Sequence, residues 1–74
     1  MEISTKDTST LSTIAQLVIV GDEKDVLEAK MLRACLETDF AKKIAAEILL
    51  SNNQICSPIA QNYVDWAKKK KNNI

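Results

Sequence analysis

The side chains of this sequence that could take part in chemistry are two cysteines and one group of carboxylates. Cys35 and Cys56 could act as nucleophiles or metal ligands, and four clustered carboxylates could act as an acid–base pair or hold a cation; they are Asp22, Glu23, Asp25 and Glu28. The chain has no histidine, which removes the commonest general base and the commonest metal ligand. The cysteines are 21 residues apart without a CxxC pair, which does not fit a zinc site. We therefore predict no catalytic residue, no cofactor and no metal, and do not expect an enzyme.

The elements expected around these residues give each of them a structural role. Residues 22–28 open a helix, where negative charge complements the exposed amides, and no glycine-containing calcium or phosphate loop lies nearby. Cys35 falls on the apolar side of that helix, so we expect a small core residue. Cys56 falls in a loop, as an ordinary thiol. No secretory context favours a disulfide between them.

A second candidate is residues 62–71, NYVDWAKKKK, where two of the three aromatic residues of the chain precede four lysines. This pattern could bind nucleic acid, bind a partner protein, or anchor a helix in the core and be followed by solvated charge. Tyr63 and Trp66 share a helical arc with Ile59 and Val64, which favours the core anchor. The lysines would then complement the dipole at the end of a helix.

The same region offers an alternative function in DNA binding. Helices at 40–51 and 58–70 with a turn between them resemble a helix-turn-helix that presents Gln61 and Asn62 to base edges. The turn is longer than the usual three or four residues, and the acidic Asp65 lies among the side chains that would contact the bases. Nucleic-acid binding is therefore the alternative and not the leading expectation.

Helical periodicity starts near residue 10. Residues 10–20 carry an apolar stripe of helical spacing that ends at Gly21, a residue type common just past a helix C-terminus. The β-branched run at 17–20 could instead form a strand, but nothing else in the chain offers that strand a partner. We predict a first helix at 10–20, preceded by a flexible, Ser/Thr-rich lead-in at residues 1–9.

Two further helices are predicted at 22–37 and 40–51. The wide apolar arc of the first is typical of a central helix that packs on two sides. The apolar stripe shifts by more than roughly 100° between the two segments, and a straight helix cannot bury opposite sides in its two halves. We therefore predict a break within ETDF, with Thr38 or Asp39 as the N-cap of the third helix.

The fourth helix is predicted at 58–70, because Ser57 and Pro58 are typical of an N-cap and a first helical position. With 46% hydrophobic and 27% charged residues, the composition is that of a chain that folds. The sequence thus predicts an all-α fold, a compact bundle of four short helices in a single domain over residues 1–74. So small a domain makes self-association or a partner plausible.

Charge is divided unevenly along the chain. Residues 1–40 hold four cations against eight carboxylates, a net charge of −4, and residues 41–74 hold six lysines against two carboxylates, a net charge of +4. This division favours packing of one half on the other, or contact between copies, over a uniform field for nucleic acid. Residues 11–20 fall well short of the roughly 20 apolar residues that span a bilayer. We expect a cytoplasmic protein without membrane contact.

Four stretches between residues 11 and 49 resemble the C-terminal region of flagellar anti-sigma factors. They are LSTIAQ at 11–16, the acidic link GDE at 21–23, LRACLETDF at 32–40, and the segment 44–49. The third is similar to the family's L-K-x-x-I-x-x-G-x-Y, and the fourth, with Ile44, Ala45 and Leu49, to its closing I-A-x-x-L.

The resemblance implies helices that wrap a sigma factor and keep it from core polymerase, with partner contacts at apolar positions: Leu32, Leu36, Phe40, Ile44 and Leu49. Together these observations predict a small non-enzymatic regulator of bacterial or phage origin that acts by protein–protein contact. Its partner would be a sigma factor or another transcription protein. A structural homodimer is a further alternative, with a two-fold interface on the wide face of the second helix.

Overall fold

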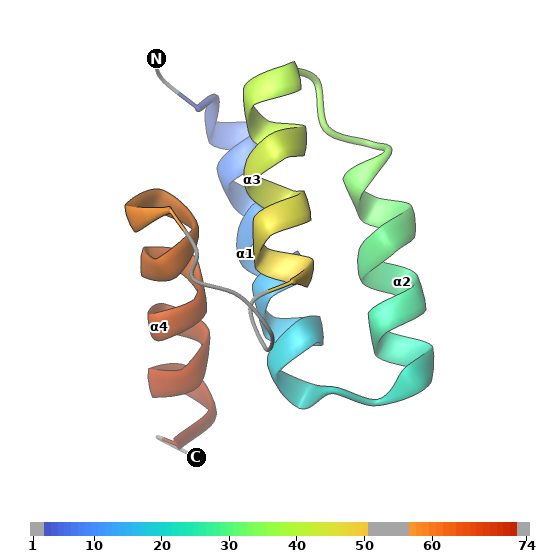
Figure 1. Ribbon diagram of the computed structural model, residues 1–74, viewed down its shortest axis with the longest axis vertical. Coiled ribbons are helices and arrows are strands. Elements are labelled where there is room, and N and C mark those ends of the chain that lie inside the picture. The colour runs from blue at the N-terminus through green and yellow to red at the C-terminus, as the bar shows by residue number, and fades with distance from the viewer. Residues whose placement is uncertain (1–2, 51–56, 73–74) are drawn as a thin grey trace.

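The computed structural model describes residues 3–50 and 57–72, and it confirms the predicted all-α bundle. Its helices are α1 (Thr5–Val20), α2 (Glu23–Arg33), α3 (Asp39–Leu49) and α4 (Pro58–Asn72). Helix α1 contacts each of the other three, whereas α2 and α4 lie on opposite sides of the α1–α3 pair and do not touch (Figure 1). The β-branched run at 17–20 is helical, and no strand occurs in the described residues.

Helix α1 begins at Thr5, so the lead-in predicted at residues 1–9 is helical over its second half. Ser4 caps this helix, because its hydroxyl accepts a hydrogen bond from the Asp7 amide at 3.1 Å. The pattern Ser4-x-x-Asp7 was the sequence signal for this start. Hydroxyls in the Ser/Thr-rich segment also donate to carbonyls four residues earlier, as Thr10 and Ser12 do, so these polar residues fit within the helix.

Helix α1 ends at Gly21, which adopts a left-handed conformation (φ 79°) and donates its amide to the Leu17 carbonyl at 3.1 Å. The prediction that the first helix ends at Gly21 is therefore confirmed. Because the region near φ +60° is strained for residues with a Cβ atom, glycine is favoured here. The turn leaves only two residues, Gly21 and Asp22, between α1 and α2, and lets α2 pack back against α1.

Helix α2 is shorter than predicted, since it ends at Arg33 and not at residue 37. The chain then turns, which brings Leu36 into the core and frees Thr38 to cap α3. The Thr38 hydroxyl accepts from the Ala41 amide at 3.2 Å, so Thr38, one of the two predicted N-caps, is confirmed, although the break begins at Ala34, before the predicted ETDF segment. Arg33 Nε donates to the Lys42 carbonyl at 3.0 Å and ties the end of α2 to α3.

The core lies around the α1–α3 pair, and these two helices contribute most of it. Both helices contain an Ile-Ala pair that faces inward, at 14–15 and at 44–45. The buried apolar residues are Leu11, Ile14, Ala15, Val18, Ala29, Leu36, Ala41, Ile44, Ala45, Ile48, Ala60, Val64 and Ala67. Six of these are alanines, whose small side chains let the helices approach closely.

Candidate protein-binding surface

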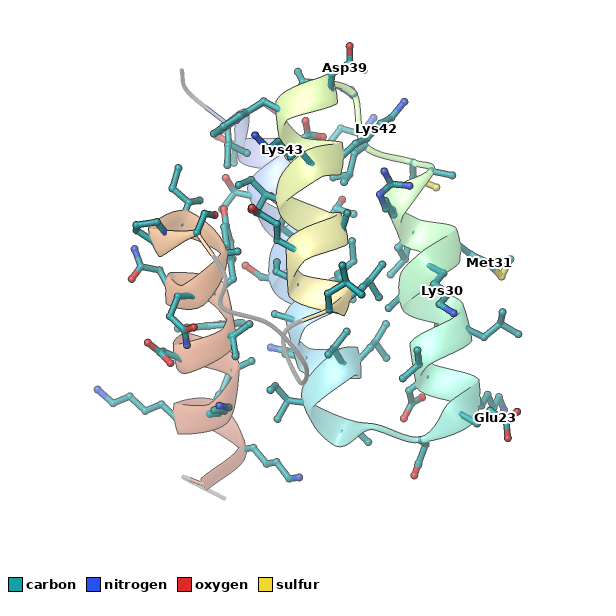
Figure 2. The ribbon with its side chains drawn as sticks, in the orientation of Figure 1. Glu23, Lys30, Met31, Asp39, Lys42 and Lys43 are labelled. Atoms are coloured by element: carbon teal, nitrogen blue, oxygen red, sulfur yellow. The ribbon has the colours of Figure 1, made fainter. Side chains whose placement is uncertain are left out.

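Helix α2 has one buried side and one exposed side, and both carry apolar residues. On the inner side, Ala29 is buried and Leu32 is partly buried against the core. On the outer side, Leu27 and Met31 leave 60% and 66% of their surface exposed. Figure 2 shows Met31 pointing away from the other helices. We define the outer face of α2 by four exposed residues: Leu27 and Met31 in the helix, and Ala34 and Cys35 in the turn that directly follows it.

The predicted position of α2 at the centre of the bundle is wrong. Helix α2 contacts only α1 and α3, so no described residue covers its outer face, and α1 is the central helix. Cys35, predicted to be a core residue, is exposed, and its Sγ atom donates to the Met31 carbonyl at 3.9 Å. The periodicity placed these apolar residues correctly on one wide arc, but the arc extends beyond the side that neighbours cover.

Charged side chains border the outer face on both edges. At about 100° per residue, Glu23 and Lys30 lie along one edge, and Lys24 and Glu28 lie along the other. All four are exposed. None of their side chains forms an ion pair or hydrogen bond with another residue in the described part of the chain. These charges are therefore available to a molecule that docks on α2.

The residues predicted to contact a partner lie inward in this fold. Leu36 and Ile44 are buried, and Leu32, Phe40 and Leu49 pack against the same core. They hold the bundle together, so contact with a partner through Leu36 or Ile44 would require the core to open. Their role in binding stays a prediction.

Sequence reasoning missed Leu27 and Met31 as surface residues because it assigned their whole arc to the core. The width of the arc was the available signal. A helix at the edge of a bundle buries a stripe roughly 100° wide, and an arc well beyond that width leaves apolar residues for a second contact.

Tyr63 and Trp66 of α4 were both predicted to be core anchors, and the structure bears this out for only one of them. Tyr63 is partly buried and packs against the core, as a core anchor should. Trp66 is instead 40% exposed, and the Lys70 ammonium lies 4.9 Å from its ring centroid. The lysine run lies within the helix, which extends to Asn72, so these cations follow the helical register of α4.

The two helices of the proposed helix-turn-helix, α3 and α4, do pack on each other. Gln61 Nε2 donates to Asp65 Oδ1 at 2.8 Å, which occupies part of the side chain predicted to read a base. Residues 51–56, which include most of the predicted turn and Cys56, lie outside the described residues. DNA binding by this pair of helices stays an alternative prediction.

A groove of about 320 Å³ lies between the ends of α1 and α4, lined by Gln16, Ile19, Val20, Ala67, Lys70 and Lys71.

Within residues 3–50 and 57–72, no three metal-ligating side chains gather closely enough to hold an ion. None of the helices found in that part of the chain has the length and apolar composition needed to cross a membrane.

No protein-family model matches this chain, and no match is found among curated proteins or solved structures. What the protein does is therefore inferred from its own surface.

Proposed function

We propose that this protein is a small non-enzymatic regulator that acts by protein–protein contact through the outer face of α2. The observation that carries the proposal is the exposure of Leu27 and Met31 on adjacent turns of a helix whose other side is docked on the bundle. Single exposed apolar residues are ordinary on protein surfaces. Two large ones in register, extended by Ala34 and Cys35, form a continuous apolar strip, and such strips mark interaction sites.

The strip is suited to a helix-in-groove contact or a helix-on-helix contact. Anchors at i, i+4 and i+7 are the spacing with which an amphipathic helix engages a partner, and Leu27, Met31 and Ala34 have that spacing. Methionine adapts to irregular apolar surfaces because its side chain is unbranched and flexible. The charged residues on both edges would set orientation and exclude wrong partners.

The partner class we favour is a bacterial or phage transcription protein such as a sigma factor, bound in the cytoplasm. The resemblance of residues 11–49 to flagellar anti-sigma factors supports this choice. In contrast to the contacts that the resemblance implies, binding through Leu27 and Met31 leaves the core closed. Sequestration would then require no unfolding of the bundle.

A pull-down from bacterial lysate tests the proposal. The bait proteins are the wild type, a Leu27→Glu/Met31→Glu double variant, and Trp66→Glu as a matched control on α4, with the same kind of change at another exposed apolar position. We expect the wild type and Trp66→Glu to retain a transcription protein that the double variant loses. Loss with Trp66→Glu alone would assign the contact to α4 and overturn the proposed surface.

Salt dependence separates protein binding from the DNA-binding alternative. Affinity for DNA falls steeply with added salt because phosphate contacts release counterions. An apolar contact on α2 should be far less sensitive. Binding of duplex DNA by the pure protein, lost between about 50 and 200 mM salt, would favour the α3–α4 alternative.

A further inference from the structure

The charge pattern around the outer face of α2 is complementary to itself. We infer that in the free protein this face pairs, antiparallel and about a two-fold axis, with the same face of a second copy of this chain. The inference rests on the proposed function, since it uses the same surface and assigns a second copy to it when the transcription protein is not bound.

The first step is the arrangement of residues around the helix. At about 100° per residue, Leu27, Met31 and Ala34 lie within roughly 60° of one another. Glu23 and Lys30 flank this strip on one edge. Figure 2 shows Glu23 at the start of α2 and Lys30 beside Met31, more than halfway along the helix. The opposite edge carries Lys24 and Glu28, so each edge holds one acid and one base.

The second step is register. When two copies of a helix pair antiparallel about a two-fold axis, each edge meets the same edge of the other copy, and residues equally far from the axis face each other. Glu23 faces Lys30 if the axis lies midway between them, and Lys24 faces Glu28 if it lies midway between those two. Both midpoints fall within one residue of Leu27, which is a rise of about 1.5 Å. One register therefore satisfies both edges at once.

The third step is that this register places apolar residues at the centre. Leu27 packs against Leu27 of the second copy at the axis, and Met31 extends over the first turn of the other α2. In a parallel two-fold pair each edge would instead meet the opposite edge of the second copy, with Glu23 near Lys24 and Lys30 near Glu28. The Glu23→Lys and Lys30→Glu variants below separate the two directions, because only antiparallel pairing brings these two positions together. The position of α2 at the edge of the bundle leaves this approach open (Figure 1).

The contact between the two copies is small. A helix of 11 residues is only about 16 Å long, and a contact of that length falls below the roughly 1,200 Å² of a standard interface. The dimer should therefore be weak and concentration-dependent. Its flanking ion pairs are at the surface, so added salt should weaken it further.

Sedimentation velocity on the pure protein tests the pairing. We expect the wild-type mass to rise with concentration from 8.2 kDa toward twice that value. Glu23→Lys and Lys30→Glu should each weaken the dimer by on the order of tenfold, because each creates like-charge contacts at two symmetric places. Lys43→Glu, the same charge change at an exposed position on α3, is the matched control and should have no effect.

Mixing the two variants is the sharpest arm of the test. In a dimer of one Glu23→Lys chain and one Lys30→Glu chain, opposite charges face each other again at both places, so the mixture should recover wild-type affinity. The Glu23→Lys/Lys30→Glu chain should recover it alone. A protein that stays monomeric at every attainable concentration, or a mixture no tighter than the separate variants, would overturn the inference. Circular dichroism confirms that each variant is folded.

Failure of this inference is distinguishable from failure of the proposed function. A monomer that captures a transcription protein through Leu27 and Met31 refutes the self-pairing and leaves the proposed function standing. A dimer unaffected by Leu27→Glu/Met31→Glu refutes the pairing through α2, because the contact must then lie elsewhere.

Discussion

The Thr38 hydroxyl donates a hydrogen bond to Asp7 Oδ2 at 3.3 Å and so joins the N-cap of α3 to the first turn of α1. Asp7 is only 1% exposed, and its other oxygen accepts from the Glu37 amide at 3.1 Å. Thr38 in turn accepts from the Ala41 amide. A buried carboxylate is tolerated when hydrogen bonds replace its hydration, and here they also hold the α2–α3 turn in place.

The start of α4 repeats this arrangement. The Ser57 hydroxyl donates to Glu47 Oε2 at 2.7 Å and accepts from the Ala60 amide at 3.4 Å, so Ser57 is the predicted N-cap. In both cases a cap hydroxyl satisfies its own helix and bonds to a carboxylate of another helix. The caps thus contribute to tertiary structure as well as to helix initiation.

Asp7→Ala should lower the free energy of unfolding by about 2 kcal/mol. The substitution removes both hydrogen bonds that the buried Asp7 side chain accepts, from the Glu37 amide and from the Thr38 hydroxyl, and each such bond contributes about 1 kcal/mol. Urea denaturation followed by circular dichroism measures the change. Glu28→Ala, which removes an exposed carboxylate without such contacts, is the control and should shift stability by less than about 0.5 kcal/mol. Equal effects would contradict the role assigned to Asp7.

Thr38→Ala should cost about 1–2 kcal/mol, whereas Thr38→Ser keeps the hydroxyl and should cost much less. Because Thr38 and Asp7 share a hydrogen bond, the Asp7→Ala/Thr38→Ala double variant should be more stable than the sum of the single effects predicts. The same denaturation measurements complete this double-mutant cycle. Strict additivity would show that the two side chains do not interact.

Trp66→Ala should cost about 1–2 kcal/mol, clearly less than the roughly 4 kcal/mol expected for Ile48→Ala, whose side chain is fully buried. A buried core anchor, as the sequence predicted for Trp66, would instead lose about 3–5 kcal/mol on the same substitution. Thermal unfolding of both variants ranks the two positions. A larger loss for Trp66→Ala than for Ile48→Ala would return Trp66 to the core.

Gly21→Ala should cost about 1 kcal/mol through backbone strain alone. A Cβ atom added at Gly21 would lie 3.7 Å from the Val18 carbonyl oxygen, an ordinary contact, so no steric clash adds to the cost. Gly21→Asn should be milder, because asparagine tolerates the left-handed conformation better. Comparing the unfolding midpoints of these two variants tests the assignment, and a more stable alanine variant would contradict it.

The signals that sequence reasoning used correctly are local. Gly21, Thr38 and Ser57 mark helix ends because their conformational freedom or their hydroxyls act on amides and carbonyls a few residues away. The phase shift before α3 was likewise a property of neighbouring residues. These features needed no knowledge of what packs where, and the all-α fold followed from them.

The position of each helix face depended on the tertiary structure. Leu27, Met31 and Trp66 have the spacing of core residues, and periodicity states which side chains share a face without stating whether a neighbour covers it. Asp7 is the converse case, a charged residue near the start of the chain that is buried because Glu37 and Thr38, some 30 residues away, supply its hydrogen bonds. By itself the sequence determined four helices and their apolar arcs. Only the packing of α2 at the edge of the bundle decided that part of one arc became an exposed surface.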